Sequence, residues 1–260
     1  MIPYYPQPAL HVGPFELHAF GALAALAVFI GGRAIMIRAH RFGIPVEQMF
    51  RFCFWVYISA MAGAVLSKTV MSDFPAFLAD PTRAFRLSLG VRSVGGISAG
   101  FLAGLVWCRY HRLTLVETMR RLDIVAYAMP MAWMIGRLGC ALAHDHRGLA
   151  STSWIAVKFP EGSRYDLGLI EFLYLIGLTA LFHFLDRRPR PVGFYFGLYG
   201  VLYGGFRVWL DTLHLQPMRF YGGIAGVLIG LLGWVAMWEL GRSRPVLESV
   251  SGSPTDLASG

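Results

Sequence analysis

The chain has 260 residues, of which 56% are hydrophobic and only 15% are charged, whereas an ordinary soluble domain carries about 25% charged residues. The apolar residues are gathered into runs long enough to cross a hydrocarbon core, which takes roughly 20 residues of helix. This composition excludes a soluble globular domain and predicts a polytopic membrane protein. The net charge of +8 does not indicate nucleic-acid binding, because the basic residues lie between the apolar runs, where the positive-inside rule explains them.

Seven apolar runs follow one another along the chain. The Pro-rich residues 1–14 lack the basic segment of a cleavable signal peptide, so the first run is expected to stay in place as a helix. An all-α membrane protein with seven transmembrane helices is therefore predicted. The runs lie at residues 17–37, 49–71, 93–107, 124–135, 167–185, 193–210 and 221–240.

The distribution of basic residues predicts the orientation of these helices. Arginines gather in the connectors after the first, third and fifth runs and in the tail, while the opposite connectors are poorer in Lys and Arg. The positive-inside rule then places the N-terminus outside and the C-terminus in the cytoplasm. Residues 1–242 are expected to form one membrane domain, and residues 243–260 a disordered cytoplasmic tail.

The segment 136–148, at the end of the fourth run, departs from the apolar pattern. Charged and titratable groups are costly in a membrane, so they should face a polar cavity, a partner or the lipid headgroups. Glycines at Gly136, Gly139 and Gly148 leave room for a backbone or a ligand to come close. In the predicted topology this segment lies at the outer leaflet. Its polar side chains belong to Arg137, His144, Asp145, His146 and Arg147.

Other polar residues occur in or beside the apolar runs. Arg207 lies inside the sixth run and Asp211 at its end, while Glu171 lies early in the fifth and could orient an arginine. His18, near the start of the first run, either lines a cavity or hydrates the helix end. The planar guanidinium fork of arginine suits a lipid phosphodiester, although a structural ion pair with a nearby aspartate is the simpler alternative.

The pair His144 and His146, with Asp145 between them, suits a general base. Imidazole, with a free pKa of about 6.5, is well matched to proton transfer near neutral pH. In a helix successive side chains diverge by about 100°, so only one of the two histidines should face a cavity. A wetted interface residue and a weak zinc-ligand spacing are the other interpretations. The possible third ligands, His18 and His214, are distant in sequence, so no metal site is predicted.

The three cysteines show no metal or redox spacing. Cys53, Cys108 and Cys140 each lie in or beside an apolar run, so we interpret them as reduced packing residues. Cys140 could in principle be a nucleophile, but its apolar surroundings favour packing.

Several motifs occur along nearly the whole chain except the tail. They are Gly13-Pro14, Leu17-His18, Phe20-Gly21, the loop 74–81, Gly95-Gly96, Gly136-Arg137, Gly139, Gly148, the connector 188–193 and the stretch 203–207. Together these motifs resemble the prolipoprotein diacylglyceryl transferase family of bacterial inner membranes. The resemblance implies a seven-span fold and transfer of a diacylglyceryl group from phosphatidylglycerol to the lipobox cysteine thiol of prolipoproteins.

The same resemblance implies roles for individual residues. Arg137 and Arg207 would hold the lipid phosphate and stabilise the leaving glycerol phosphate, while a histidine or carboxylate of the 144–146 segment would assist deprotonation of the thiol. The expected catalytic residues are thus His144, Asp145 and His146. No cofactor is needed, because the phospholipid is already an activated alkyl donor. The expected partners are phosphatidylglycerol, lipobox peptides and membrane lipids. The other residues expected at the lipid site are Gly136, Gly148, Gly95, Gly96, Asp211 and His18.

The chain also departs from the family pattern. The family usually has a tyrosine where this chain has Phe20 and a histidine where it has Val94. The two asparagines of the family signature correspond to Cys140 and Ala143, and its glutamate to Asp145. These changes favour one alternative, a divergent homologue that binds phospholipid without catalysis or modifies another acceptor. A transporter or channel is the other alternative, although the intramembrane charges gather towards one side rather than crossing both leaflets.

Overall fold

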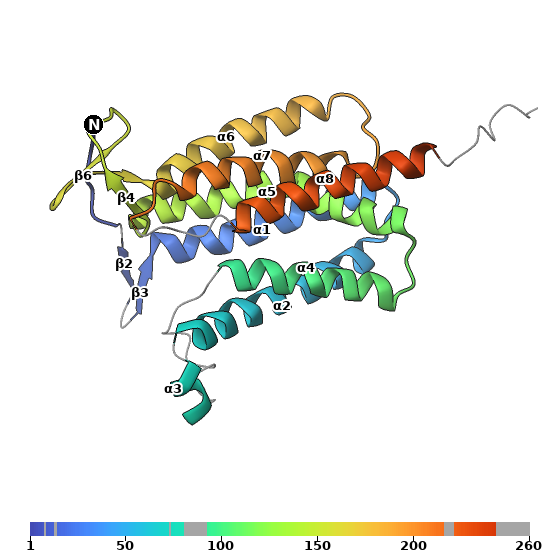
Figure 1. The fold of residues 1–260 in the computed structure, drawn as a ribbon, viewed down its shortest axis with the longest axis horizontal. Coiled ribbons are helices and arrows are strands. Elements are labelled where there is room, and N and C mark those ends of the chain that lie inside the picture. The colour runs from blue at the N-terminus through green and yellow to red at the C-terminus, as the bar shows by residue number, and fades with distance from the viewer. Residues whose placement is uncertain (8, 13–14, 73, 81–92, 216–220, 243–260) are drawn as a thin grey trace, which may run out of the picture.

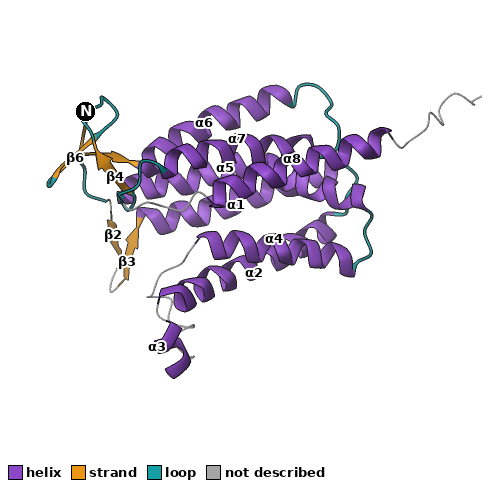
Figure 2. Ribbon diagram, in the orientation of Figure 1, coloured by secondary structure: helices purple, strands orange, loops and turns teal. Residues whose placement is uncertain are grey.

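The computed structural model describes residues 1–7, 9–12, 15–72, 74–80, 93–215 and 221–242. The predicted tail, 243–260, the matching pair Gly13-Pro14 and the end of the loop 74–81 lie outside these residues. Within them the chain forms seven helices of 18 to 29 residues, one short helix and six short strands (Figures 1 and 2). The long helices are α1 (Ala19–Arg41), α2 (Val46–Ser72), α4 (Ser93–Tyr110), α5 (Leu115–Ala143), α6 (Leu167–Leu185), α7 (Phe194–Asp211) and α8 (Tyr221–Arg242).

The helical architecture predicted from the sequence is confirmed, and the long helices match the seven apolar runs in order. Four candidate spans among the described residues are long and apolar enough to cross a membrane. They are Ala19–Arg41, Val46–Ser67, Leu115–Ala143 and Leu167–Leu185. Seven spans and their orientation stay a prediction.

The long helices pack in pairs, with α1 against α5, α2 against α4, and α7 against α8 (Figure 1). Small residues allow the last two pairs to come close. A methyl group added at Gly95 would lie 2.6 Å from the Gly63 carbonyl oxygen of α2, and one at Gly204 would lie 2.8 Å from the Gly223 carbonyl oxygen of α8. Small residues in both helices of a pair thus permit this close contact.

Helix α5 starts earlier than its apolar run. Thr114 and Glu117 form a capping box, in which the Thr114 hydroxyl oxygen accepts from the Glu117 backbone N–H and the Glu117 carboxylate accepts from the Thr114 N–H. The polar residues of its first turns find partners in other helices: Arg121 donates to Gln48 of α2 over 2.8 Å, and Asp123 accepts from the backbone N–H of Phe196 over 3.0 Å. Hydropathy alone misses this start because these contacts are tertiary.

The prediction of an all-α protein omitted two small sheets at the end of the bundle that holds the N-terminus (Figure 2). One pairs β2 (Ala9–Val12) with β3 (Phe15–His18). In the other, β4 (Arg147–Ala150), β5 (Val157–Phe159) and β6 (Gly162–Asp166) come from the polar segment between α5 and α6, and β1 (Ile2–Pro3) adds to it in parallel. The sequence showed only polarity here, since strands of two to five residues carry too little periodicity to predict.

The basic connectors meet at the other end of the bundle. Arg38, at the end of α1, forms an ion pair of 2.8 Å with Asp186 after α6, and its guanidinium lies 3.6 Å from the centre of the Tyr127 ring. Tyr195 donates its hydroxyl hydrogen to the same aspartate over 3.1 Å. This network joins α1, α5, α6 and α7 near the end of the bundle opposite the sheets.

Candidate functional site

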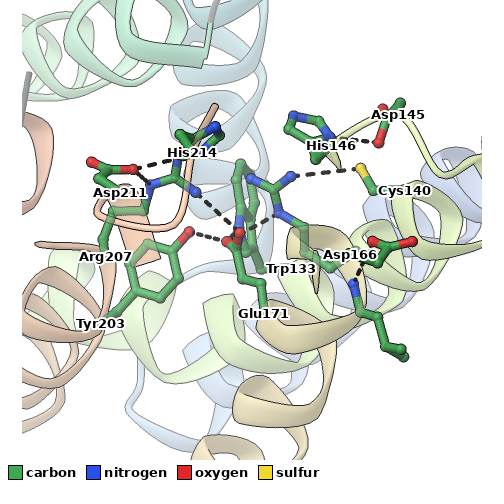
Figure 3. Close-up of polar contacts among 12 residues, drawn as sticks. Trp133, Cys140, Asp145, His146, Asp166, Glu171, Tyr203, Arg207, Asp211 and His214 are labelled. Atoms are coloured by element: carbon green, nitrogen blue, oxygen red, sulfur yellow. Dashed lines mark hydrogen bonds and ion pairs between the residues drawn. The ribbon is translucent and has the colours of Figure 1, made fainter. Parts of the chain in front are cut away.

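Glu171, in the first turns of α6, is the centre of the polar cluster at the N-terminal end of the bundle (Figure 3). Its side chain is 1% exposed and accepts hydrogen bonds from Tyr203 Oη at 2.5 Å and Trp133 Nε1 at 3.0 Å. It also faces both arginines, Arg137 on α5 and Arg207 on α7. A buried carboxylate is tolerated only when such partners offset the loss of hydration. Glu171 therefore joins three helices into one site.

Arg137 contacts Glu171 through Nε, which lies 3.0 Å from Oε1, and donates from Nη1 to the sulfur of Cys140 at 3.6 Å. Nε is not aligned for a hydrogen bond, so the contact with Glu171 is ionic. The side chain of Arg137 is 10% exposed, and its guanidinium also lies 5.4 Å from the Trp133 ring centre. Arg137 thus connects the glutamate to the last turn of α5.

Arg207 extends the cluster along α7. Its Nη1 donates to Glu171 Oε2 at 3.1 Å, and its Nε lies 3.0 Å from Asp211 Oδ1, one helical turn later. His214, just after the helix, approaches the same Asp211 oxygen at 3.8 Å. The structure therefore brings Arg137, Arg207 and Asp211 together, and it adds Glu171 and His214.

His144 ends α5 in the left-handed conformation, with φ of 50°. Histidine enters this region more readily than most residues, but it does so at a cost in free energy. Both ring nitrogens face acceptors that hold it: Nδ1 lies 2.5 Å from Asp166 Oδ2, and Nε2 lies 3.1 Å from the Tyr5 carbonyl oxygen. Tyr4 and Phe159 pack against the ring. His144 therefore joins α5 to the start of α6 and to the N-terminal segment, and its turn directs the chain back towards α5.

Asp166 is the N-cap of α6 and is 1% exposed. Its Oδ1 accepts from the Leu169 backbone N–H over 3.1 Å, while Oδ2 faces His144. Burial raises the pKa of Asp166, and the hydrogen bonds with His144 and Leu169 oppose that effect.

After this turn, Asp145 and His146 lie beside Cys140 (Figure 3). His146 Nδ1 lies 2.5 Å from Asp145 Oδ1, and the donor atoms of all three residues are within 4.8 Å of one another. Hydrogen bonds with Asp145 and then with Cys140 raise the pKa of His146 to about 9, against the opposing effect of burial. The sulfur of Cys140 is thus placed between His146 and Arg137.

The surroundings of His214 lower its pKa, whereas those of His146 raise it. Burial, followed by the charges of Arg207 and His146, lowers the pKa of His214 to about 4. Its side chain is 14% exposed, so this histidine is neutral at physiological pH beside a charged arginine.

The glycines predicted for the lipid site differ in their surroundings. Gly148, in β4, lies against the Leu213 carbonyl oxygen, where a methyl group would approach to 2.8 Å, and Gly136 has open space around its Cα. Gly95 and Gly96 contact α2, where they serve helix packing. His18 is the last residue of β3 and precedes α1 without capping it through its side chain.

Sequence reasoning did not assign several members of this site. Glu171 was noted only as a partner for an arginine, although a lone acid inside an apolar run is itself a strong signal. Trp133, Tyr203 and Asp166 gave no such signal, because aromatic residues and N-caps are common in membrane helices. Cys140 was interpreted as packing, since only the turn at His144 brings Asp145 and His146 onto it.

The sequence is similar to a known protein family and to several of its members. The family described as prolipoprotein diacylglyceryl transferase matches residues 7–238. The chain is 28% identical over 254 residues to the phosphatidylglycerol–prolipoprotein diacylglyceryl transferase of Azotobacter vinelandii, covering 92% of this chain and 91% of that protein. Its identity to the transferase of the same name from Pseudomonas fluorescens is 27% over 255 residues, covering 92% and 90%. For Pseudoalteromonas atlantica it is 27% over 220 residues, covering 81% and 76%. The family match covers six of the seven long helices in full, most of α8 and the polar cluster, and the chain therefore belongs to the prolipoprotein diacylglyceryl transferase family of bacterial membrane enzymes.

Proposed function

We propose that this protein transfers the diacylglyceryl group of phosphatidylglycerol to the lipobox cysteine thiol of prolipoproteins at the outer face of the bacterial inner membrane. The observation that carries this proposal is the pair of arginines, Arg137 and Arg207, that share the buried carboxylate of Glu171. Two guanidinium groups from different helices converge there on one small volume at the end of the bundle. Such a site suits one anionic headgroup.

The arginines keep donors for a phosphate. Each guanidinium has five N–H groups, and the contacts given above use Nε and Nη1 of both side chains. We propose that Nη2 of Arg137 and Nη2 of Arg207 bind the phosphate oxygens, while Glu171 and Asp211 fix the two side chains. Gly136, Gly148 and His18 are proposed to border the lipid, with Gly95 and Gly96 supporting the fold beside it.

The chemistry follows from charge. The acceptor thiolate attacks the carbon of the diacylated glycerol that is joined to the phosphate. The bond between that carbon and the phosphate oxygen breaks. The phosphate changes from a diester with one negative charge to a monoester with two. Arg137 and Arg207 therefore stabilise the transition state more than the bound lipid, which is the condition for a gain in rate.

The segment after α5 is proposed to promote ionisation of the acceptor thiol. Among its residues we assign this role to Asp145 and His146, since both ring nitrogens of His144 are engaged by Asp166 and Tyr5. His144 then positions the other two.

One observation favours the second candidate, a homologue that binds phospholipid without catalysis. In the structure the charges of Arg137 and Arg207 are already balanced by Glu171 and Asp211, as in a structural ion-pair network. Such a network would stabilise the bundle without any phosphate.

The experiment is transfer of a labelled diacylglyceryl group to a lipobox peptide by the purified full-length protein in phosphatidylglycerol-containing vesicles. A peptide with serine in place of the lipobox cysteine is the control. We expect a thioether product with the cysteine peptide alone, and rescue of a strain depleted of its own transferase. Lipid binding without product, together with no rescue, would select the non-catalytic homologue instead.

A further inference from the structure

The three side chains that meet after α5 combine the donor types of a transition-metal site. Cys140 offers a sulfur, His146 a ring nitrogen and Asp145 a carboxylate oxygen, and these atoms lie within 4.8 Å of one another. Zinc binds sulfur at about 2.3 Å and nitrogen or oxygen at about 2.0 to 2.2 Å, so tetrahedral ligands lie roughly 3 to 4 Å apart. Small side-chain movements are therefore enough to close this cluster around an ion.

The backbone conformation around His144 brings the three side chains together without a bound ion. Cys140 lies in the last turn of α5, and the left-handed turn at His144 returns the chain so that Asp145 and His146 lie over that turn. The two contacts of the His144 ring, with Asp166 and Tyr5, hold this costly conformation. A strained turn with three donors beside it indicates a functional arrangement rather than incidental packing.

We propose that Cys140, Asp145 and His146 bind a divalent transition-metal ion, zinc by preference, and leave its fourth position for the thiol of an acceptor. Mixed sulfur, imidazole and carboxylate donors in tetrahedral geometry favour zinc over harder ions. Sites with three protein ligands are typical of catalytic zinc, whereas structural zinc has four. From the sequence no metal is predicted, because only His18 and His214 are considered as third ligands and Cys140 is interpreted as a packing residue.

Access and charge agree with this assignment. Cys140 is buried, while the side chains of Asp145 and His146 are 39% and 37% exposed, so a ligand can approach from their side. The guanidinium of Arg137 lies close and donates from Nη1 to the Cys140 sulfur, but its charge is shared with Glu171.

The metal would act on the reaction as follows, and this last step rests on the proposed function. A thiol that coordinates a metal is deprotonated outright. The acceptor thiol replaces a metal-bound hydroxide, and its proton leaves with that hydroxide as water. The thiolate then forms its bond to the glycerol carbon as the carbon–oxygen bond breaks, and the electron pair stays on the phosphate that Arg137 and Arg207 hold. No electron is gained or lost. In this form His146 is a ligand and not a proton acceptor.

The test is metal binding by the full-length protein purified in detergent without chelator. We expect one zinc per chain by elemental analysis. After removal of the metal, Co²⁺ should restore a tetrahedral spectrum with a sulfur-to-cobalt charge-transfer band. Cys140→Ser should abolish that band, and His146→Gln and Asp145→Asn should each weaken binding by about 10-fold or more. His146→Cys should still bind and should intensify the band, because it keeps a ligand and adds a sulfur.

Two matched variants serve as controls. Cys108→Ser removes another buried thiol, and His214→Gln removes a histidine of the neighbouring cluster, and both should keep full metal content. Wild type that binds no more metal than Cys140→Ser would overturn the proposal, as would equal loss in the two controls. The outcomes separate this inference from the proposed function: metal binding without transfer would support the metal site and reject the transferase, whereas transfer by a wild-type protein that binds no metal would reject the metal site and support the transferase.

Discussion

At the scale of single residues, Glu171 explains why two arginines can lie inside an apolar bundle. Its two oxygens face Arg137 and Arg207, and Tyr203 and Trp133 donate hydrogen bonds to the same carboxylate. Losing one member of a buried ionic network leaves an uncompensated charge, which costs about 3 to 5 kcal/mol. Variants of these residues must therefore be compared at equal folded concentration.

The first prediction concerns Arg137. We expect Arg137→Lys to lower the rate of diacylglyceryl transfer by about 100-fold or more, nearly as much as Arg137→Ala, because a compact ammonium cannot replace the planar fork. The measurement is the initial rate in phosphatidylglycerol vesicles, normalised to folded protein.

Arg147→Lys is the control, since Arg147 pairs with Glu161 on the surface. It should leave the rate unchanged. Full activity in stable Arg137→Ala would remove this arginine from the lipid site.

The second prediction concerns His214 and the stability of the protein at low pH. Its folded-state pKa is depressed from 6.5 to about 4 by burial and by Arg207, His146 and Arg137, with Glu171 opposing. Between these values the unfolded chain binds a proton that the folded chain does not. Stability is therefore lost as pH falls below about 6.5, by roughly 2 kcal/mol at pH 5 for this residue.

We expect His214→Gln to reduce the difference in melting temperature between pH 7.5 and pH 5, measured in one detergent. Asp211, which faces His214 at 3.8 Å, is unchanged in this variant. His40→Gln alters an exposed histidine and should not affect the difference. If the two variants behave alike, another group is responsible for the acid sensitivity.

At the scale of elements, adjacent glycines on α7 have opposite roles. A methyl group at Gly204 would lie 2.8 Å from both the Gly223 oxygen and the Val227 nitrogen of α8, while one at Gly205 would meet nothing within 4 Å. The contact between these helices therefore depends on only one of the pair. The same helix carries Arg207, so its packing also positions the site.

The third prediction follows from this pair. Gly204→Ala should lower the free energy of unfolding by about 1 to 3 kcal/mol, because backbone atoms cannot move away from the added methyl group. Gly205→Ala should be neutral or stabilising by up to about 1 kcal/mol, since alanine is the better helix former. Thermal unfolding of the two variants in the same detergent measures both. Equal stability would mean that α7 and α8 are less closely packed than described.

At the scale of the whole molecule, the two ends of the bundle differ in chemistry. One end holds the sheets, the N-terminus and the arginine cluster, and the other holds the basic connectors around Arg38 and Asp186 (Figure 1). If the basic end is cytoplasmic, the site faces the outer leaflet, where a secreted preprotein would meet it.

The fourth prediction tests this orientation with alkaline phosphatase, which is active only outside the cytoplasm. A fusion after Ser163, in β6, should be active, while fusions after Arg190 and after Gly260 should be inactive. The reverse pattern would place the arginine cluster at the cytoplasmic leaflet and would reject the proposed site of action.

The sequence by itself determined the membrane class and the order of the long helices. These features follow from local composition, because a hydrocarbon solvent selects apolar runs. The motifs around Arg137 and Arg207 likewise led to the family before any contact was known.

Tertiary structure alone decided what these residues touch. Glu171, Arg137 and Arg207 are on three helices, and no local pattern predicts that one carboxylate serves both arginines. The same holds for Cys140, whose neighbours Asp145 and His146 reach it only through the left-handed turn at His144. That turn is fixed by Asp166 and by the carbonyl of Tyr5, at the far end of the sequence. Local sequence specifies which segments are helical, but contacts between distant segments determine which polar groups share one site.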